Sequence, residues 1–182
     1  VGDDRCVVRQ DDHGGARLMA DHLLARGVRS LAVLLPRYAG PMTDARLAGL
    51  KEGFAGSGVR ISIDVITAQT NDFAGGLDAI GSYLDRAPLP SAFVGINDEL
   101  ALSAMRAVQD RGFTVPKDAM IVGFNGFQPA SYTQPTLTTI ESRADEIGAV
   151  SGRILIDRLS GKRFPSADHV LPVSFRKGQS TR

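Results

Sequence analysis

Short apolar segments of strand length alternate with longer segments of helical period along most of this chain. Residues 31–35 form an unbroken apolar run, Leu-Ala-Val-Leu-Leu, and Pro36 follows it. Such a run is typical of a parallel strand covered by helices on both faces, because a half-exposed strand alternates polar and apolar residues. The alternation therefore predicts βαβ units and an α/β fold built on a doubly wound parallel sheet.

The helical segments begin at residues that favour helix starts. Asp72 is expected to cap one helix, Asn97 or Asp98 a second, and Thr43 or Asp44 a third. The helix after Asp72 is predicted to face the core with one apolar stripe, formed by Phe73, Leu77, Ile80 and Leu84.

Both ends of the chain hold elements that do not fit this sheet of four or five strands. A strand is predicted at residues 6–9, a helix at about 143–160, and a last strand at 170–175. The leading strand and the long helix have no sheet of their own. We expect them to belong to a neighbouring lobe whose other strands precede residue 1, so that the chain, which lacks an initiator Met, is a fragment.

Composition argues against several kinds of partner. Lys and Arg number 21 against 20 for Asp and Glu, which gives a net charge of +1 and no field of one sign to hold nucleic acid. One Cys leaves no disulfide framework and no Cys-rich zinc site, so we expect no metal and no cofactor. No apolar run approaches the ~20 residues that span a bilayer, and we expect a cytoplasmic protein without a membrane partner.

Catalytic motifs are absent from the sequence, which favours a binding protein over an enzyme. The three His residues are scattered, and neither HExxH, GxSxG, a Walker A loop nor GxGxxG occurs. A flavodoxin-like enzyme or receiver would need a phosphate-binding loop or an acidic cluster after its first strand. Residues 36–40, Pro-Arg-Tyr-Ala-Gly, offer neither.

Several short motifs occur in an order that resembles the LacI/GalR family of transcription regulators. They are Arg-Leu-Ala-Gly at 46–49, Asn-Asp-Glu-Leu-Ala at 97–101, the run 112–124, Leu-Thr-Thr-Ile at 137–140 and the ending 171–181. Together they cover essentially the whole chain. The resemblance implies an effector domain like a periplasmic binding protein of type I, with two lobes joined by three crossovers, and a helix-turn-helix headpiece that this chain lacks.

The same resemblance implies the division of the chain and its function. Residues 11–139 and 170–182 would form the C-terminal lobe, and residues 1–10 and 143–169 would be remnants of the N-terminal lobe. A sugar-like effector, a sugar or a sugar acid, would bind between the lobes and modulate the binding of operator DNA by the headpiece. The alternative is an extracytoplasmic sugar-binding protein of a transporter, which shares the fold; the motifs at 97–101, 112–124 and 171–181 favour the regulator.

Three polar residues are the main candidates for ligand binding, since a crevice forms at the carboxyl ends of parallel strands. Arg46 matches an arginine that binds sugar hydroxyls or a carboxylate, and a cation in the first turn of a helix needs a compensating group. Asn97 matches a ligand-contacting Asn and can also cap its helix. Asn125 stands where the family commonly has Asp. Because an amide that both donates and accepts replaces this acid while Arg46 is kept, we expect a neutral or anionic ligand.

Weaker candidates surround these three. Phe73 aligns with an aromatic that stacks on the ligand, although core packing explains it equally well. Tyr38 and Phe127 are candidates from position alone, and Asp11, at the family's crossover, is a candidate that also suits a cap or a hinge.

The resemblance also implies a homodimer. Leu102 lies off the inward face of its helix and Tyr132 lies in a long loop, so both are expected on the dimer interface.

Overall fold

The computed structural model describes residues 6–38, 40–162 and 167–181, and most of them form one six-stranded sheet with helices on both faces. The order is β3-β2-β4-β5-β6-β8, and every pair is parallel except β6 and β8. The strands are β2 (Ser30–Pro36), β3 (Ser62–Ala68), β4 (Ala92–Gly95), β5 (Met120–Asn125), β6 (Thr138–Glu141) and β8 (Ser174–Arg176). The predicted α/β fold with a mostly parallel sheet is confirmed, with one strand more than expected.

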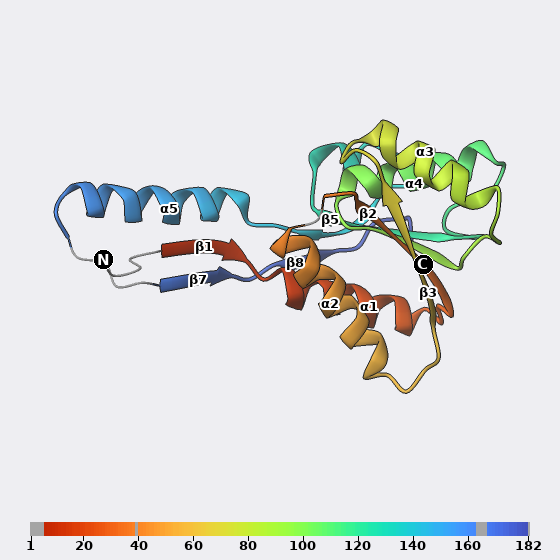
Figure 1. The fold of residues 1–182 in the computed structure, drawn as a ribbon, viewed down its shortest axis with the longest axis horizontal. Helices are drawn as coiled ribbons and strands as arrows, with labels where there is room; N and C mark the ends of the chain where they lie inside the picture. The colour runs from red at the N-terminus through yellow and green to blue at the C-terminus, as the bar shows by residue number, and fades with distance from the viewer. Residues whose placement is uncertain (1–5, 39, 163–166, 182) are drawn as a thin grey trace.

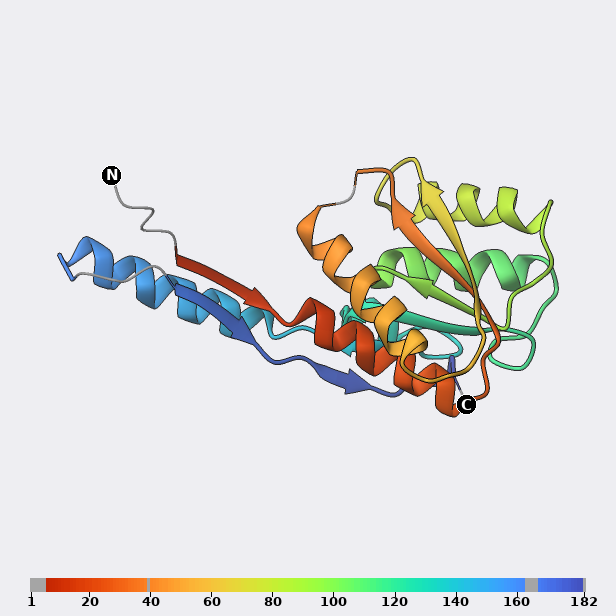
Figure 2. The same cartoon turned by 60° about the horizontal axis from the view of Figure 1, so that its bottom comes forward.

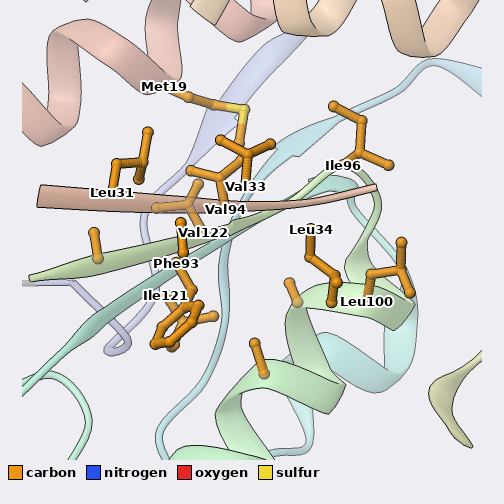
Figure 3. Close-up of a cluster of buried hydrophobic side chains, with 14 of the residues drawn as sticks. Met19, Leu31, Val33, Leu34, Phe93, Val94, Ile96, Leu100, Ile121 and Val122 are labelled. Carbon is orange, nitrogen blue, oxygen red and sulfur yellow. The ribbon is translucent and has the colours of Figure 1, made fainter. Parts of the chain in front are cut away.

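Two pairs of helices enclose this sheet (Figure 1). One face carries α1 (Asp12–Ala25) and α2 (Pro41–Ala55), and the other carries α3 (Phe73–Leu84) and α4 (Asp98–Asp110). Figure 3 shows Met19 of α1 over one face of the sheet and Leu100 of α4 on the other side. Gly49 lets α2 approach the backbone of His13 so closely that a Cβ would clash there. We call this sheet, α1–α4 and the short 3-10 helix Gln128–Ser131 the body.

The helix starts agree with the sequence in two cases and differ in one. Asp72 and Asn97 cap α3 and α4 through their side chains, as predicted. The expected cap of α2 at Thr43 or Asp44 is wrong, because the helix begins earlier, with Gly40 as its cap and Pro41 in its first turn. Proline suits that position because its fixed φ is helical and its missing N–H would be unpaired there.

The expected core stripe of α3 is wrong at its first residue. Phe73 is 38% exposed, whereas Ile80 is fully buried. Phe73 occupies the first helical position, immediately after the cap Asp72, and lies at the rim of the body.

Three elements extend from the body as an arm (Figures 1 and 2). We define the arm as β1 (Cys6–Gln10), α5 (Ala144–Leu159) and β7 (Ala167–Leu171). β1 and β7 form a parallel two-stranded sheet, and α5 packs beside β1. The expectation that the leading strand has no sheet is therefore wrong, since it pairs with β7. The remaining residues expected in this region, 1–5 and 163–166, lie outside the described ranges.

The last predicted strand, at residues 170–175, is in fact two strands with different partners. Val170 and Leu171 belong to β7 and pair with β1, whereas β8 pairs with β6 in the body. Pro172 lies between them and has no N–H to continue the ladder. The pairing partner of this segment therefore changes at Pro172.

No helix within the described part of the chain is long and apolar enough to cross a lipid bilayer.

Candidate functional site

A cleft of about 690 Å³ lies between the arm and the body. It is situated where β5 and β1 end at their carboxyl termini, which is the usual place for a ligand in a parallel sheet. Both parts of the molecule line it: Val8, Arg9, Gln10, Ser142, Ala144 and Ile147 on the side of the arm and its connections, and Asp12, Pro41, Met42, Ala45 and Asn125 on the side of the body.

Arg46 lies behind the wall of this cleft, in the second turn of α2, and is only 2% exposed. Its guanidinium donates from Nε to Asp12 Oδ1 at 2.7 Å and from Nη2 to Asn125 Oδ1 at 3.1 Å. Nη1 donates to the carbonyl oxygen of Ile96 at 2.6 Å. The guanidinium also stacks on Phe124, 3.8 Å from the ring centroid. Arg46 therefore joins α1, α2 and the ends of β4 and β5.

Asp12 is the compensating group of Arg46, which lies in the second turn of α2 and not in the first turn as expected, because the helix begins at Pro41. The ion pair is almost completely buried, with 3% of the Arg46 side chain and 8% of the Asp12 side chain exposed. Burial lowers the pKa of Arg46, and the bond to Asp12 opposes that change. The pair is electrically neutral as a unit, so Arg46 brings no net positive charge to the cleft.

Asn125 connects this ion pair to the surface of the cleft. Its φ of 116° lies in a region that asparagine tolerates better than most other non-glycine residues. Its side-chain oxygen accepts the bond from Arg46, and its backbone carbonyl accepts bonds from the N–H and the hydroxyl of Ser142, both at 3.2 Å. Asn125 thus holds the connection from β6 to α5 against the body.

A continuous set of hydrogen bonds crosses the site from one connection to another. Gln10, at the end of β1, donates to Asp12 Oδ1 at 2.9 Å, the atom that also accepts from Arg46. The set continues through Asn125 to Ser142, and we call it the Gln10–Ser142 network. The connection from β7 to β8 is tied in by the backbone bond from Asp11 N to the carbonyl of Leu171. All the connections between arm and body are therefore bonded to one another.

Asn97 lies next to this network but its side chain bonds elsewhere. Oδ1 caps α4 by accepting from Leu100 N at 2.9 Å, and Nδ2 donates to Asn71 Oδ1 at 2.8 Å. The structure thus brings Arg46 and Asn125 into contact, whereas Asn97 reaches Arg46 only through the preceding carbonyl of Ile96.

Asp98 is fully buried and has a structural place. Its carboxylate accepts bonds from the hydroxyl of Thr139 and, at 2.6 Å, from the N–H of Phe127. Burial raises the pKa of Asp98, and these bonds oppose the shift.

None of the four weaker candidates lines the cleft. Asp11 caps α1 by accepting from Gly14 N at 2.8 Å. Tyr38 is 83% exposed and lies against Arg37. Phe73 and Phe127 are both exposed in part.

The two residues expected at a dimer interface differ in exposure. Tyr132 is exposed, as expected, whereas Leu102 is half-buried and packs partly against the core.

Sequence reasoning did not identify Gln10, Asp12, Met42 and Ser142 as site residues. The one available signal was the need of Arg46 for a compensating group, which pointed to a carboxylate without saying which one. Within the described ranges no group of three or more His, Cys, Asp or Glu side chains could hold a metal ion. The site is therefore a cleft lined by polar and apolar side chains and by Arg9 and Asp12, each in an ion pair, with Arg46 behind its wall.

The chain matches a known protein family and is similar to known transcription regulators. Residues 20–181 match the profile of the periplasmic binding protein-like domain. The HTH-type transcriptional repressor MelR of Bacillus subtilis is 38% identical over 98 residues, which are 53% of this chain and 28% of MelR. The HTH-type transcriptional regulator DegA of the same organism is 31% identical over 175 residues, which are 96% of this chain and 52% of DegA.

A similar structure is known as well. A LacI family transcriptional regulator from Enterococcus faecium, solved with bound ribose, superposes with a TM-score of 0.91 at 28% identity, over 100% of this chain and 67% of that protein. The chain spans about half or less of the length of MelR and DegA.

Proposed function

We propose that this chain is the effector-sensing domain of a LacI-type transcription regulator. The chain belongs to the periplasmic binding protein-like domain family, and its relatives are LacI-type transcription regulators. The single observation that carries this proposal is the cleft between arm and body, whose wall holds Asn125 with Arg46 directly behind it. No covalent chemistry is required of such a site.

We assign the body to the C-terminal lobe of this domain and the arm to the N-terminal lobe. The separate sheets of the two parts support this division, because among the described residues β1 and β7 pair with each other while the other strands form the large sheet. In the natural protein the apolar side chains of the arm would then pack against the rest of the N-terminal lobe.

The ligand proposed for the cleft is a small sugar-like molecule. Asn125 and Ser142 supply groups that donate and accept hydrogen bonds to hydroxyls, and Met42 and Ile147 supply apolar surface for the CH faces of a sugar ring. The relative from Enterococcus faecium binds ribose, a molecule of this kind.

The Gln10–Ser142 network suggests how binding would be transmitted. A ligand that bonds to Asn125 or Ser142 acts on the same groups that fix the arm to the body, so it binds one arrangement of the two parts better than another. In a homodimeric, cytoplasmic regulator this change of lobe arrangement would alter how a helix-turn-helix headpiece meets operator DNA.

Calorimetry and thermal shift of the natural full-length protein against sugars, polyols and sugar acids test the site. Ala45→Phe places a large side chain in the cleft from the second turn of α2, and Ala55→Phe places the same side chain on the exposed last turn of that helix. We expect Ala45→Phe to abolish binding and Ala55→Phe to bind as the natural protein does. Equal binding by both variants would place the ligand elsewhere.

Gel-shift titration then separates a regulator from a transport protein. We expect the full-length protein to bind DNA from its own upstream region with an affinity that changes when the same ligand is added, and expect Ala45→Phe to lose this response. DNA binding that is identical with and without ligand would contradict the sensing role.

A further inference from the structure

We propose that Asp12 determines the charge selectivity of the cleft, by cancelling the charge of Arg46 so that uncharged ligands are preferred to anionic ones. This inference rests on the proposed function, since it assumes that the cleft binds a ligand. Asp12 lies on the wall of the cleft and is not among the residues that the sequence predicted to bind a ligand.

The geometry places the charge of Arg46 within reach of any ligand bonded to Asn125. Nη2 of Arg46 is 3.1 Å from Asn125 Oδ1, and Asn125 lines the cleft. A ligand bonded to Asn125 would lie one hydrogen bond beyond this contact, and the charge of a buried guanidinium would still attract its carboxylate there, because the low polarity of the interior screens the attraction poorly. The Asp12 carboxylate, 2.7 Å from Nε, already supplies the counter-charge.

The second arginine at the cleft is also paired. Arg9 lines the cleft, and its guanidinium binds Asp168 of β7 at 2.7 Å. The charged side chains that line the cleft are thus Arg9 and Asp12, and each is paired with an opposite charge. The Arg9 pair is half-exposed and therefore screened by solvent, so the buried pair has the greater influence on the charge of a ligand.

Asp12→Asn isolates this charge with little change of shape. Gln10 and Arg46 both donate to Oδ1 of Asp12, and an asparagine can keep an acceptor oxygen in that place. The variant would keep both hydrogen bonds and leave Arg46 with a net positive charge. A sugar acid could then serve as the missing counter-ion.

The test compares neutral and acidic probes that share the same sugar ring: glucose with glucuronate, and galactose with galacturonate. Calorimetry on the full-length protein gives the ratio of acid to neutral affinity for each pair. We expect this ratio to rise about tenfold or more in Asp12→Asn. Asp110→Asn is the control, because it removes one carboxylate from an exposed Asp–Arg pair at the end of α4 and changes the net charge equally.

Asn125→Asp tests the opposite direction and does not depend on the folding of Asp12→Asn. It adds a carboxylate beside Arg46, so the ratio of acid to neutral affinity is expected to fall by about tenfold. An unchanged ratio in a folded variant of either kind, or a shift of the same size in Asp110→Asn, would overturn the inference. Tighter binding of the acid than of the neutral sugar by the natural protein would also overturn the inference. If no probe binds the natural protein, the proposed sugar site fails and the inference fails with it.

Discussion

The body and the arm have similar apolar periodicity in sequence but different packing in the structure. Every buried apolar side chain among the described residues lies between Ala16 and Ile140, within the body. The helix of the arm, α5, has no buried residue, and its Leu159 is 80% exposed. Figure 2 shows the arm reaching away from the layers of the body. The body therefore contains its own core, whereas the described residues bury no apolar side chain of the arm.

The largest difference in the free energy of unfolding is expected between variants that break the buried ion pair of the cleft and variants that break the exposed ion pair of the arm. Asp12→Ala leaves the charge of Arg46 buried without its partner, so the free energy of unfolding should fall by about 3–5 kcal/mol. Asp168→Ala breaks the Arg9 pair, which solvent already screens, and should leave the free energy of unfolding unchanged within error. Urea denaturation measures both, and similar losses would contradict the comparison.

Two leucines on helices provide the matched test of packing. Leu50 of α2 is 1% exposed, and Leu50→Ala should lower the free energy of unfolding by about 2–4 kcal/mol because it leaves a cavity in the core. Leu159→Ala in α5 should change it by less than about 0.5 kcal/mol in this chain.

The same substitutions in the full-length protein sharpen the assignment of the arm. If the rest of an N-terminal lobe covers α5, Leu159→Ala should become clearly destabilising there while the effect of Leu50→Ala stays the same. A negligible effect of Leu159→Ala in both proteins would show that this face remains exposed.

The smallest of the expected differences is a pH dependence of the stability of the body. His22 bonds to Thr181 Oγ1 at 2.8 Å and accepts from Arg26 Nε at 3.2 Å. Burial, with the nearby charges of Arg26 and Lys177, lowers the pKa of His22 from 6.5 to about 4. The unfolded chain then binds a proton more readily than the folded one, so stability falls as the pH decreases from 6.5 towards 4.

Between pH 7 and pH 5 this loss should amount to roughly 1 kcal/mol, allowing for contact with solvent. His22→Gln keeps a group that can bond to Thr181 and removes the titration, so its denaturation midpoint should depend less on pH across this range. A pH dependence equal to that of the natural chain would exclude His22 as its source.

The sequence predicted the body better than the arm or the site, for physical reasons. The buried run at residues 31–35 and the caps Asp72 and Asn97 are local signals, and the structure confirms them. The pairing of β1 with β7 joins residues about 160 positions apart, and no local pattern encodes such a partner.

The site shows the same limit. The sequence predicted Arg46 and Asn125 as site residues and predicted that Arg46 needs a counter-charge. It could not predict the three polar contacts of the Arg46 guanidinium, because these depend on how α1, α2, β4 and β5 meet. Asp12 and Asp11 are neighbours at the start of one helix. Only the fold shows that Asp11 caps α1 and that Asp12 pairs with Arg46.

Amide hydrogen exchange of the full-length protein, with and without the ligand that produces the largest thermal shift, tests the central claim most directly. If the ligand lies between arm and body, exchange should slow in peptides covering residues 8–12, 41–46 and 141–147 together, because these segments line the cleft from both sides. Protection confined to the groove along β3 and α3, within residues 65–86, or to one side of the cleft alone would contradict it.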